Sequence, residues 1–224
     1  MKTMTLKNFA TVHLLLTYGT KILLHNNKMK LKRGKNCGLL GGNDTGKSNL
    51  MRSIANNQVE GFPDTNEVRT VFVEADIQGE QSHLSCIDYV HVTEEIQALN
   101  ITKEEIISVL ATVGFTDDGK AKLNHAVSRL SGVWHMKLAL ARAMLQKTDI
   151  LLLDEPINHF DVINVAWVKS YLNSLTEVTA IIVSHESGFL NDYCTHILQI
   201  ENLKLHTFKG RLGEFVKIKP SARA

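Results

Sequence analysis

The chain has 224 residues, of which 44% are hydrophobic and 21% charged, and its formal net charge is +2; this suits one α/β domain, or a core domain with a subdomain. The balanced charge gives no reason to expect direct sequence-specific binding of nucleic acid, and the three scattered cysteines exclude a disulfide framework. No apolar run approaches the roughly 18 residues of a membrane span and no signal-peptide core is present, so we predict a soluble, cytoplasmic protein without a membrane partner.

The first part of the chain is predicted to be β structure. Strands are expected at Thr11–Leu16, Lys21–Leu24 and Met29–Leu31, where β-formers or alternation dominate. The basic residues of the run 28–33 alternate with apolar ones, as on the solvated face of a strand. The ring of Tyr18 could stack on adenine, or the residue could be an ordinary turn tyrosine, and its position alone does not decide between them.

The prediction depends most on a complete G-x-x-x-x-G-K-S phosphate loop. Its residues are Gly41, Gly42, Asn43, Asp44, Thr45, Gly46, Lys47 and Ser48, and Asn49 follows. A short buried strand at 36–40 precedes the loop and a helix at 47–55 follows it, which is the setting that the motif requires. The glycines let backbone N–H groups point at phosphate oxygens, while Lys47 would reach the β- and γ-phosphates and Ser48 would hold Mg²⁺. The alternative is a glycine-rich turn before a surface helix.

Helical signals dominate residues 85–146, after a predicted strand at 68–74. We predict a helical subdomain there, inserted into a core formed by residues 1–84 and 147–224, so that residues 1–224 make one domain. Thr102 and Glu105 are expected to form a capping box. The residues expected to fill the buried face of the following helix are Ile106, Ile107, Val109, Leu110 and Val113, before the terminating Gly114.

A second predicted helix begins after Ser131-Gly132-Val133-Trp134. Its expected buried residues are Leu138, Ala139, Ala141, Ala143, Met144 and Leu145. The apolar run 150–153 then reads as a strand buried on both faces of a parallel sheet. A helix at 162–175, a buried strand at 180–183 and an edge hairpin at 197–208 complete the expected α/β fold.

Three polar residues follow the two predicted buried strands. Asp154 can hold Mg²⁺, and Glu155 can orient or deprotonate an attacking water molecule. His185 can hydrogen-bond a γ-phosphate. The alternatives are two acids that cap a helix start and a histidine that is satisfied within its loop.

The order of these motifs resembles that of an ATP-binding cassette ATPase. Segments such as LLLTYGTKILL at 14–24, MKLALARAML at 136–145 and NVAW at 164–167 are further similar to the first cassette of the translation elongation factor 3 family. The resemblance implies a P-loop α/β nucleotide-binding domain, with a parallel core sheet, an N-terminal antiparallel β region and an inserted helical subdomain. It also implies ATP and Mg²⁺ as cofactors, ATP hydrolysis and the ribosome as a partner.

The resemblance assigns further residues as well. It implies that Tyr18 stacks on adenine and that Trp134 packs on its own helix. Ser131 and Gly132 would contact a nucleotide held by a second cassette, in a homodimer or on another chain, and Asp161 would lie in the loop that meets this partner.

The sequence also departs from the family pattern. Val133 replaces the second glycine of the signature, where a β-branched residue obstructs approach to phosphate. Ala75 stands where related cassettes carry Gln or His, and Gln78 comes three residues late; Ile157 and Phe160 are milder changes. Three hypotheses follow: a translation-associated ATPase, a module that binds ATP but hydrolyses it poorly and regulates a partner, and a transporter cassette.

Overall fold

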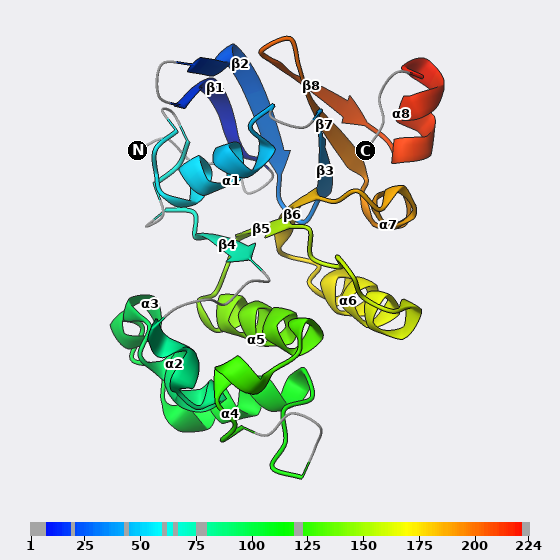
Figure 1. The fold of residues 1–224 in the computed structure, drawn as a ribbon. Coiled ribbons are helices and arrows are strands. Elements are labelled where there is room, and N and C mark those ends of the chain that lie inside the picture. Colours follow the sequence, from blue (N-terminus) through cyan, green and yellow to red (C-terminus); the bar gives the residue numbers. More distant parts are fainter. Residues whose placement is uncertain are drawn as a thin grey trace. The chain divides into compact units, whose positions relative to one another are not determined.

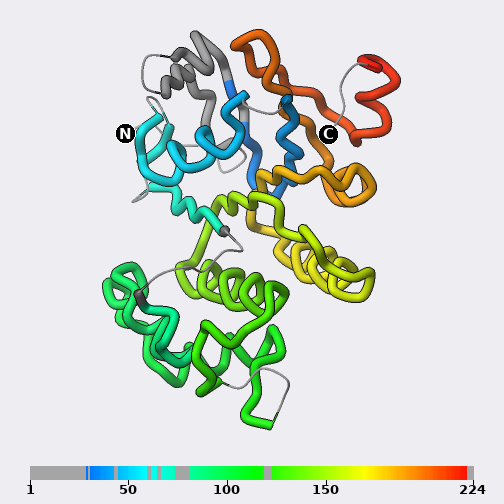
Figure 2. The backbone as a smooth tube through the Cα atoms, in the orientation of Figure 1, coloured from blue at the N-terminus to red at the C-terminus, as the bar shows by residue number. Residues whose placement is uncertain are grey.

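The computed structural model describes residues 8–18, 21–42, 45–59, 62–64, 67–74, 80–118 and 123–220, with side chains from Met29 onward except Lys30, Glu74 and Glu80. The chain divides into two compact units. The first comprises Met1–Phe72 and Asp149–Ala224, and the second comprises Val73–Thr148. The backbone trace passes once out of the first unit and once back into it (Figure 2). The sequence interpretation places these changes at 84/85 and 146/147.

The first unit contains two sheets (Figure 1). Strands β1 (Asn8–Tyr18) and β2 (Lys21–Lys32) form an antiparallel pair. The prediction of separate strands at 21–24 and 29–31 is wrong, since β2 is continuous, and β1 extends beyond the predicted 11–16 at both ends. The second sheet has the order β4-β5-β6-β3-β7-β8. Its strands are β3 (Asn36–Leu40), β4 (Thr70–Glu74, of which Thr70–Phe72 lie in the first unit), β5 (Ile150–Asp154), β6 (Thr179–Val183), β7 (His196–Glu201) and β8 (Lys204–Lys209).

The centre of this larger sheet is parallel. β6 pairs in parallel with both β5 and β3, and β3 also pairs in parallel with β7, whereas β8 runs antiparallel to β7. All five residues of β6 and the first four of β5 are buried, because a parallel strand needs cover on both faces. The predicted mostly parallel α/β sheet is therefore confirmed.

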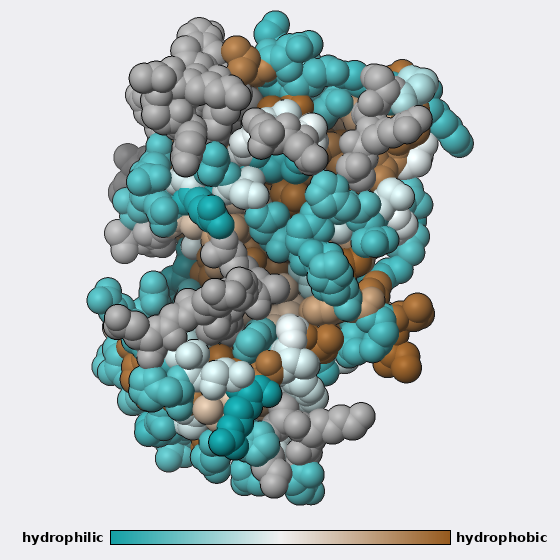
Figure 3. Space-filling view, viewed as in Figure 1, coloured by the Kyte–Doolittle hydropathy of each residue, from teal (hydrophilic) through white to brown (hydrophobic). Residues whose placement is uncertain are grey.

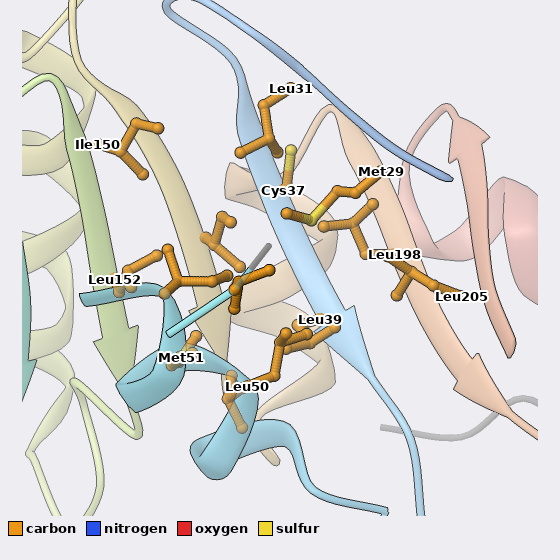
Figure 4. Close-up of a cluster of buried hydrophobic side chains, with 14 of the residues drawn as sticks. Met29, Leu31, Cys37, Leu39, Leu50, Met51, Ile150, Leu152, Leu198 and Leu205 are labelled. Atoms are coloured by element: carbon orange, nitrogen blue, oxygen red, sulfur yellow. The ribbon is translucent and has the colours of Figure 1, made fainter. Parts of the chain in front are cut away.

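Helix α1 (Lys47–Ala55) covers part of the sheet. Its Leu50, Met51 and Ile54 are at most 1% exposed and belong to the same apolar cluster as Leu39 and Leu152. Figure 4 shows Leu50 and Met51 of the helix beside Leu39 and Leu152 of the strands. The packing fixes the start of α1 beside the end of β3. The remaining helices of this unit are α6 (Val162–Ser174), α7 (Ser187–Tyr193) and α8 (Leu212–Ile218).

The second unit is helical in its described part. Its helices are α2 (Cys86–His91), α3 (Glu94–Ala98), α4 (Lys103–Thr112) and α5 (Gly132–Leu145), with short 3₁₀ turns at Glu80–His83 and Val127–Arg129. No helix in the described part of the chain is long and apolar enough to cross a membrane.

The capping box of α4 is confirmed, since the Glu105 N–H donates to Thr102 Oγ1 at 3.2 Å and the Thr102 N–H donates to Glu105 Oε2 at 2.8 Å. Two predictions of burial in this unit are wrong. Ile107 is 37% exposed, because the buried face of α4 follows the helical spacing of Ile106, Leu110 and Val113. In α5, Met144 is only partly buried, while Met136 and Leu140 join the core.

Candidate active site

Three segments meet at one edge of the large sheet. Gly38 of β3 pairs with Ile182 of β6, and Ile182 in turn pairs with Leu153 of β5. Counting three residues onward from Gly38, Ile182 and Leu153 leads to Gly41, His185 and Pro156, and Pro156 directly follows Glu155. The register therefore brings the phosphate loop, the acidic pair and the histidine to the same carboxyl edge, where ligands of open α/β sheets bind.

The phosphate loop has the backbone that an anion site needs. Gly46 adopts a φ of 89°, a region that favours glycine, and directly precedes α1. No side chain in the described part of the chain caps this helix, and its first turn contains no acidic residue. The N–H groups at the start of α1 are thus open to an anion. Asn43 and Asp44 lie outside the described residues.

The ammonium group of Lys47 is held within the loop. Its Nζ donates to the carbonyl oxygens of Gly41 at 2.7 Å and Gly42 at 3.2 Å. Thr45 also stabilises the loop, since its Oγ1 donates to the Gly42 carbonyl oxygen at 2.9 Å. A fixed positive charge therefore stands where the motif predicts that phosphate binds.

Glu155 is held in a strained position beside this loop. Its φ of 48° lies in the left-handed region, and its N–H donates to the Val183 oxygen at 2.9 Å. The backbone N–H of His185 donates to Glu155 Oε2 at 3.3 Å, and His185 Nε2 lies 3.4 Å from Oε1. Oε1 is buried and accepts no hydrogen bond from any described residue. Such an oxygen is suited to accept a proton or a hydrogen bond from a bound water molecule.

Burial raises the pKa of the Glu155 carboxyl above its ordinary value, and the negative charge of Asp154 acts in the same direction. The backbone N–H and the ring of His185, and the charge of Lys47, oppose this shift. The charges of Lys47 and Asp154 thus act directly on Glu155, so the proposed lysine, metal ligand and base share one electrostatic environment.

The side chains present fit a bound Mg²⁺. Ser48, on the first turn of α1, and Asp154, at the end of β5, are both partly exposed and supply the oxygen ligands that this ion prefers. Within the described ranges, no three His, Cys, Asp or Glu side chains cluster to hold a metal. Magnesium in phosphate sites takes only one or two protein ligands and completes its shell with phosphate and water.

Sequence reasoning missed the other flank of the loop. Strand β7 lies close to the start of the loop. Leu40 pairs with Gln199 of β7, and a Cβ added to Gly41 would lie only 3.3 Å from the Ile200 carbonyl oxygen. Lys219, just beyond α8, donates to Gln199 Oε1 at 3.0 Å and forms an ion pair with Glu201. No local pattern could reveal this contact, because it joins the end of the chain to a strand that lies beside the loop.

The signature residues Ser131 and Gly132 lie at the start of α5 in the second unit. Both are exposed, and the Ser131 side chain makes no capping hydrogen bond. Trp134 packs edge-on against Phe115, with ring centroids 5.0 Å apart, and Lys137 Nζ lies 4.4 Å from the centroid of the Trp134 ring. Lys137 lies on the same helix α5, as expected for the packing of Trp134, whereas Phe115 lies beyond the end of α4.

Asp161 caps helix α6. Its Oδ1 accepts the Asn164 backbone N–H at 2.9 Å, and this hydrogen bond lowers the pKa of the carboxyl. Val162 and Ile163 follow it and are 85% and 81% exposed. Hydrophobic side chains are visible at the surface near α6 (Figure 3).

The remaining predicted positions are less completely described. Asn49 lies in the first turn of α1 and is partly buried. For Tyr18, the last residue of β1, only the backbone is described, and Ala75 and Gln78 fall outside the described residues.

A mostly parallel α/β sheet with a phosphate loop after β3 and an acidic pair after β5 defines the class of P-loop nucleotide-binding proteins. Within that class, the chain belongs to the ABC transporter family, whose family model matches residues 24–158. A nucleotide-free ATP-binding cassette from an ABC transporter has a similar fold, with a TM-score of 0.78 and 15% identity over 96% of this chain and 95% of that one.

Several relatives are much more similar in sequence. Elongation factor 3 of Phytophthora infestans is 53% identical over 93% of this chain, and elongation factor 3B of Saccharomyces cerevisiae is 50% identical over 93%. The [NU+] prion formation protein 1 of the same yeast is 49% identical over 93%. The chain spans only 20%, 19% and 17% of these proteins, or about a fifth of their length.

Proposed function

We propose that this chain is a cytoplasmic Mg-ATP-hydrolysing cassette that pairs with a second cassette and couples its cycle to translation elongation on the ribosome. The observation that carries the proposal is the shared carboxyl edge of β3, β5 and β6. There the phosphate loop and the His185 ring come together with the buried Glu155 Oε1, which has no hydrogen-bond donor among the described residues.

Each residue has a role that follows from its position. The loop amides and Lys47 bind the phosphates, with Tyr18 beneath the adenine. Ser48 and Asp154 would hold Mg²⁺, which supplies positive charge against the phosphate oxygens. Glu155 accepts a proton from the attacking water through Oε1, while His185 stabilises its second oxygen and hydrogen-bonds the γ-phosphate.

The partner completes the site. Ser131 and Gly132 stand exposed at the start of α5, where backbone N–H groups can complete a clamp on a nucleotide that the second cassette holds. The exposed Val162 and Ile163 beside Asp161 provide apolar surface for that partner. The translation role rests on the relatives that are named elongation factor 3.

The Glu155→Gln variant tests the hydrolytic part. We expect turnover to fall by about 100-fold or more, the effect of losing a general base, while the affinity for Mg-ATP stays within a few-fold of wild type. Turnover at the wild-type rate in this variant would overturn the proposal. Measuring each protein with and without added ribosomes tests the coupling, since stimulation of wild type alone is expected and no stimulation would contradict the translation role.

A second candidate is a cassette that binds ATP but hydrolyses it poorly, favoured by Val133 at the second residue of α5. Under this reading, Val133→Gly raises the turnover of the paired cassettes and leaves ATP affinity unchanged. Unchanged turnover in this variant would exclude obstruction at position 133 as the cause of slow hydrolysis.

A further inference from the structure

A second group of charged residues lies at the opposite, amino edge of the large sheet. His196 begins β7 and pairs with Lys209 at the end of β8. Thr195 connects this pair to β3, since its N–H donates to the Asn36 oxygen at 2.9 Å and its carbonyl accepts the Gly210 N–H at 3.0 Å. The turn before β3 is closed by the Lys35 N–H, which donates to the Lys32 oxygen at 3.3 Å. Four basic residues from β2, the β2–β3 turn, β7 and β8 therefore gather at one edge.

We call Lys32, Lys35, His196 and Lys209 the amino-edge patch. The three lysines are exposed, and none of them forms an ion pair within the described part of the chain. Nearby carboxylates are engaged elsewhere. Asp149 accepts from Arg33 at 3.2 Å, the exposed Glu177 carboxylate lies 4.0 Å from Arg33 Nε, and Glu214 accepts the Arg211 N–H at 2.8 Å. The patch therefore presents positive charge that the described chain leaves uncompensated.

The behaviour of His196 agrees with this geometry. Its partial burial lowers the pKa of the ring, and the charges of Lys35, Lys32 and Lys209 lower it further. Three lysines from separate elements thus act on one histidine. The Thr195 hydroxyl lies 3.0 Å from His196 Nδ1 and adds a polar group to the patch.

We propose that the amino-edge patch binds the phosphate backbone of RNA without reading its sequence. Lysine ammonium groups provide the point charges that such binding uses, and sequence-independent affinity comes mainly from these contacts. The chemistry favours RNA over an acidic protein because protein interfaces usually have an apolar core. The large exposed hydrophobic residues of the described chain are Val92, Ile107, Val162, Ile163, Leu203 and Ile218, and none belongs to the patch.

The location makes this binding separable from nucleotide binding. Strand β3 begins at Asn36, beside the patch, and its five residues end immediately before Gly41 of the phosphate loop. Five strand residues span about 17 Å, so the two anion sites lie at opposite ends of one short strand. RNA can therefore occupy the patch whether or not nucleotide is bound. A negative result for RNA binding would not affect the test of ATP hydrolysis, and a negative result for ATP hydrolysis would not affect the test of RNA binding.

The test compares two triple charge reversals in the full chain. The patch variant carries Lys32→Glu, Lys35→Glu and Lys209→Glu, and the control carries Lys147→Glu, Lys204→Glu and Lys217→Glu, three exposed lysines outside the patch. Both change the net charge equally. Binding of a fluorescent oligouridylate is followed by anisotropy between about 50 and 200 mM salt, and circular dichroism and ATP turnover verify that each variant is folded.

We expect wild type to bind with a salt-dependent affinity, because binding releases about 0.7 counterions per phosphate contact with single-stranded RNA. The patch variant should lose about two units of the log–log salt slope and at least about tenfold in affinity at low salt, whereas the control should change less than about threefold. Equal losses in both variants, or no binding by wild type at about 50 mM salt, would overturn the proposal. Binding of polyglutamate but not of RNA would instead assign the patch to an acidic protein.

Discussion

The backbone of Glu155 has a φ of 48°, and its side chain is 26% exposed, with one buried oxygen that accepts no hydrogen bond from the residues that the structure describes. A non-glycine residue in this conformation, and a carboxylate that is partly removed from water, both cost free energy. The surrounding contacts hold the group in place at this cost. Because strain of this kind is characteristic of functional sites, it supports the catalytic role that we propose for Glu155.

The raised pKa of Glu155 predicts a gain in stability on Glu155→Gln. In the unfolded chain the carboxyl titrates near 4.5, and in the folded chain it titrates at a higher pH. Above that folded pKa the ionised group weakens the fold, and protonation removes this penalty as the pH falls. We expect Glu155→Gln to raise Tm at pH 7.5, with a difference that shrinks toward pH 4.5. Glu186→Gln, at an exposed neighbour, is the control. A lower Tm of Glu155→Gln at pH 7.5 would show that the charge is favourable.

The first two loop glycines should differ in their tolerance of alanine. A Cβ on Gly41 would lie 2.5 Å from Thr45 Oγ1 and 3.3 Å from the Ile200 oxygen, whereas one on Gly42 would come no closer than 3.7 Å to Thr45. We expect Gly41→Ala to lower Tm and to weaken ATP binding by at least about tenfold, equivalent to about 1.4 kcal/mol. Gly42→Ala should leave Tm unchanged. Similar Tm losses for the two variants in thermal unfolding would contradict this account of the loop.

At the scale of single elements, α4 is stabilised by its capping box. Replacing an N-cap threonine by alanine costs about 1 kcal/mol. We therefore expect Thr102→Ala to lower the stability of the second unit by about that amount, measured by urea unfolding. Ser108→Ala, at an exposed position inside the same helix, is the matched control and should be neutral or slightly stabilising. Loss of stability in the control alone would mean that the cap contributes nothing.

Elements with strong local signals could be predicted closely. The strand at 36–40 and the helix at 47–55 agree with β3 and α1, because the glycine loop separates two clear patterns. Helices α2 and α3 were not predicted individually, because each has no more than six residues and too little periodicity to identify. The burial of Ile107 was overestimated because an apolar residue was assumed to face the core, whereas the spacing of its neighbours decides which face is buried.

At the scale of the whole molecule, sequence patterns supplied the residue types of the candidate site but not all of its neighbours. The doubly buried strands 150–153 and 180–183 predicted a parallel sheet, and that sheet brings His185 to Glu155. The contact of Lys219 with Glu201 and the amino-edge patch depend on strand order and on the packing of the last helix. Local periodicity carries no information about these long-range arrangements, so only the folded chain reveals them.

The central claim is that the phosphate loop between β3 and α1 binds the triphosphate of ATP and that Lys47 contributes directly to this binding. The most direct measurement is equilibrium titration of wild type, Lys47→Ala and Glu155→Gln with a fluorescent ATP analogue and Mg²⁺. Loss of a charged hydrogen-bond donor costs about 1.5–3 kcal/mol, so Lys47→Ala should bind about 10- to 100-fold more weakly, while Glu155→Gln should keep near wild-type affinity. Wild-type affinity in Lys47→Ala, or no binding by folded wild type, would contradict the account.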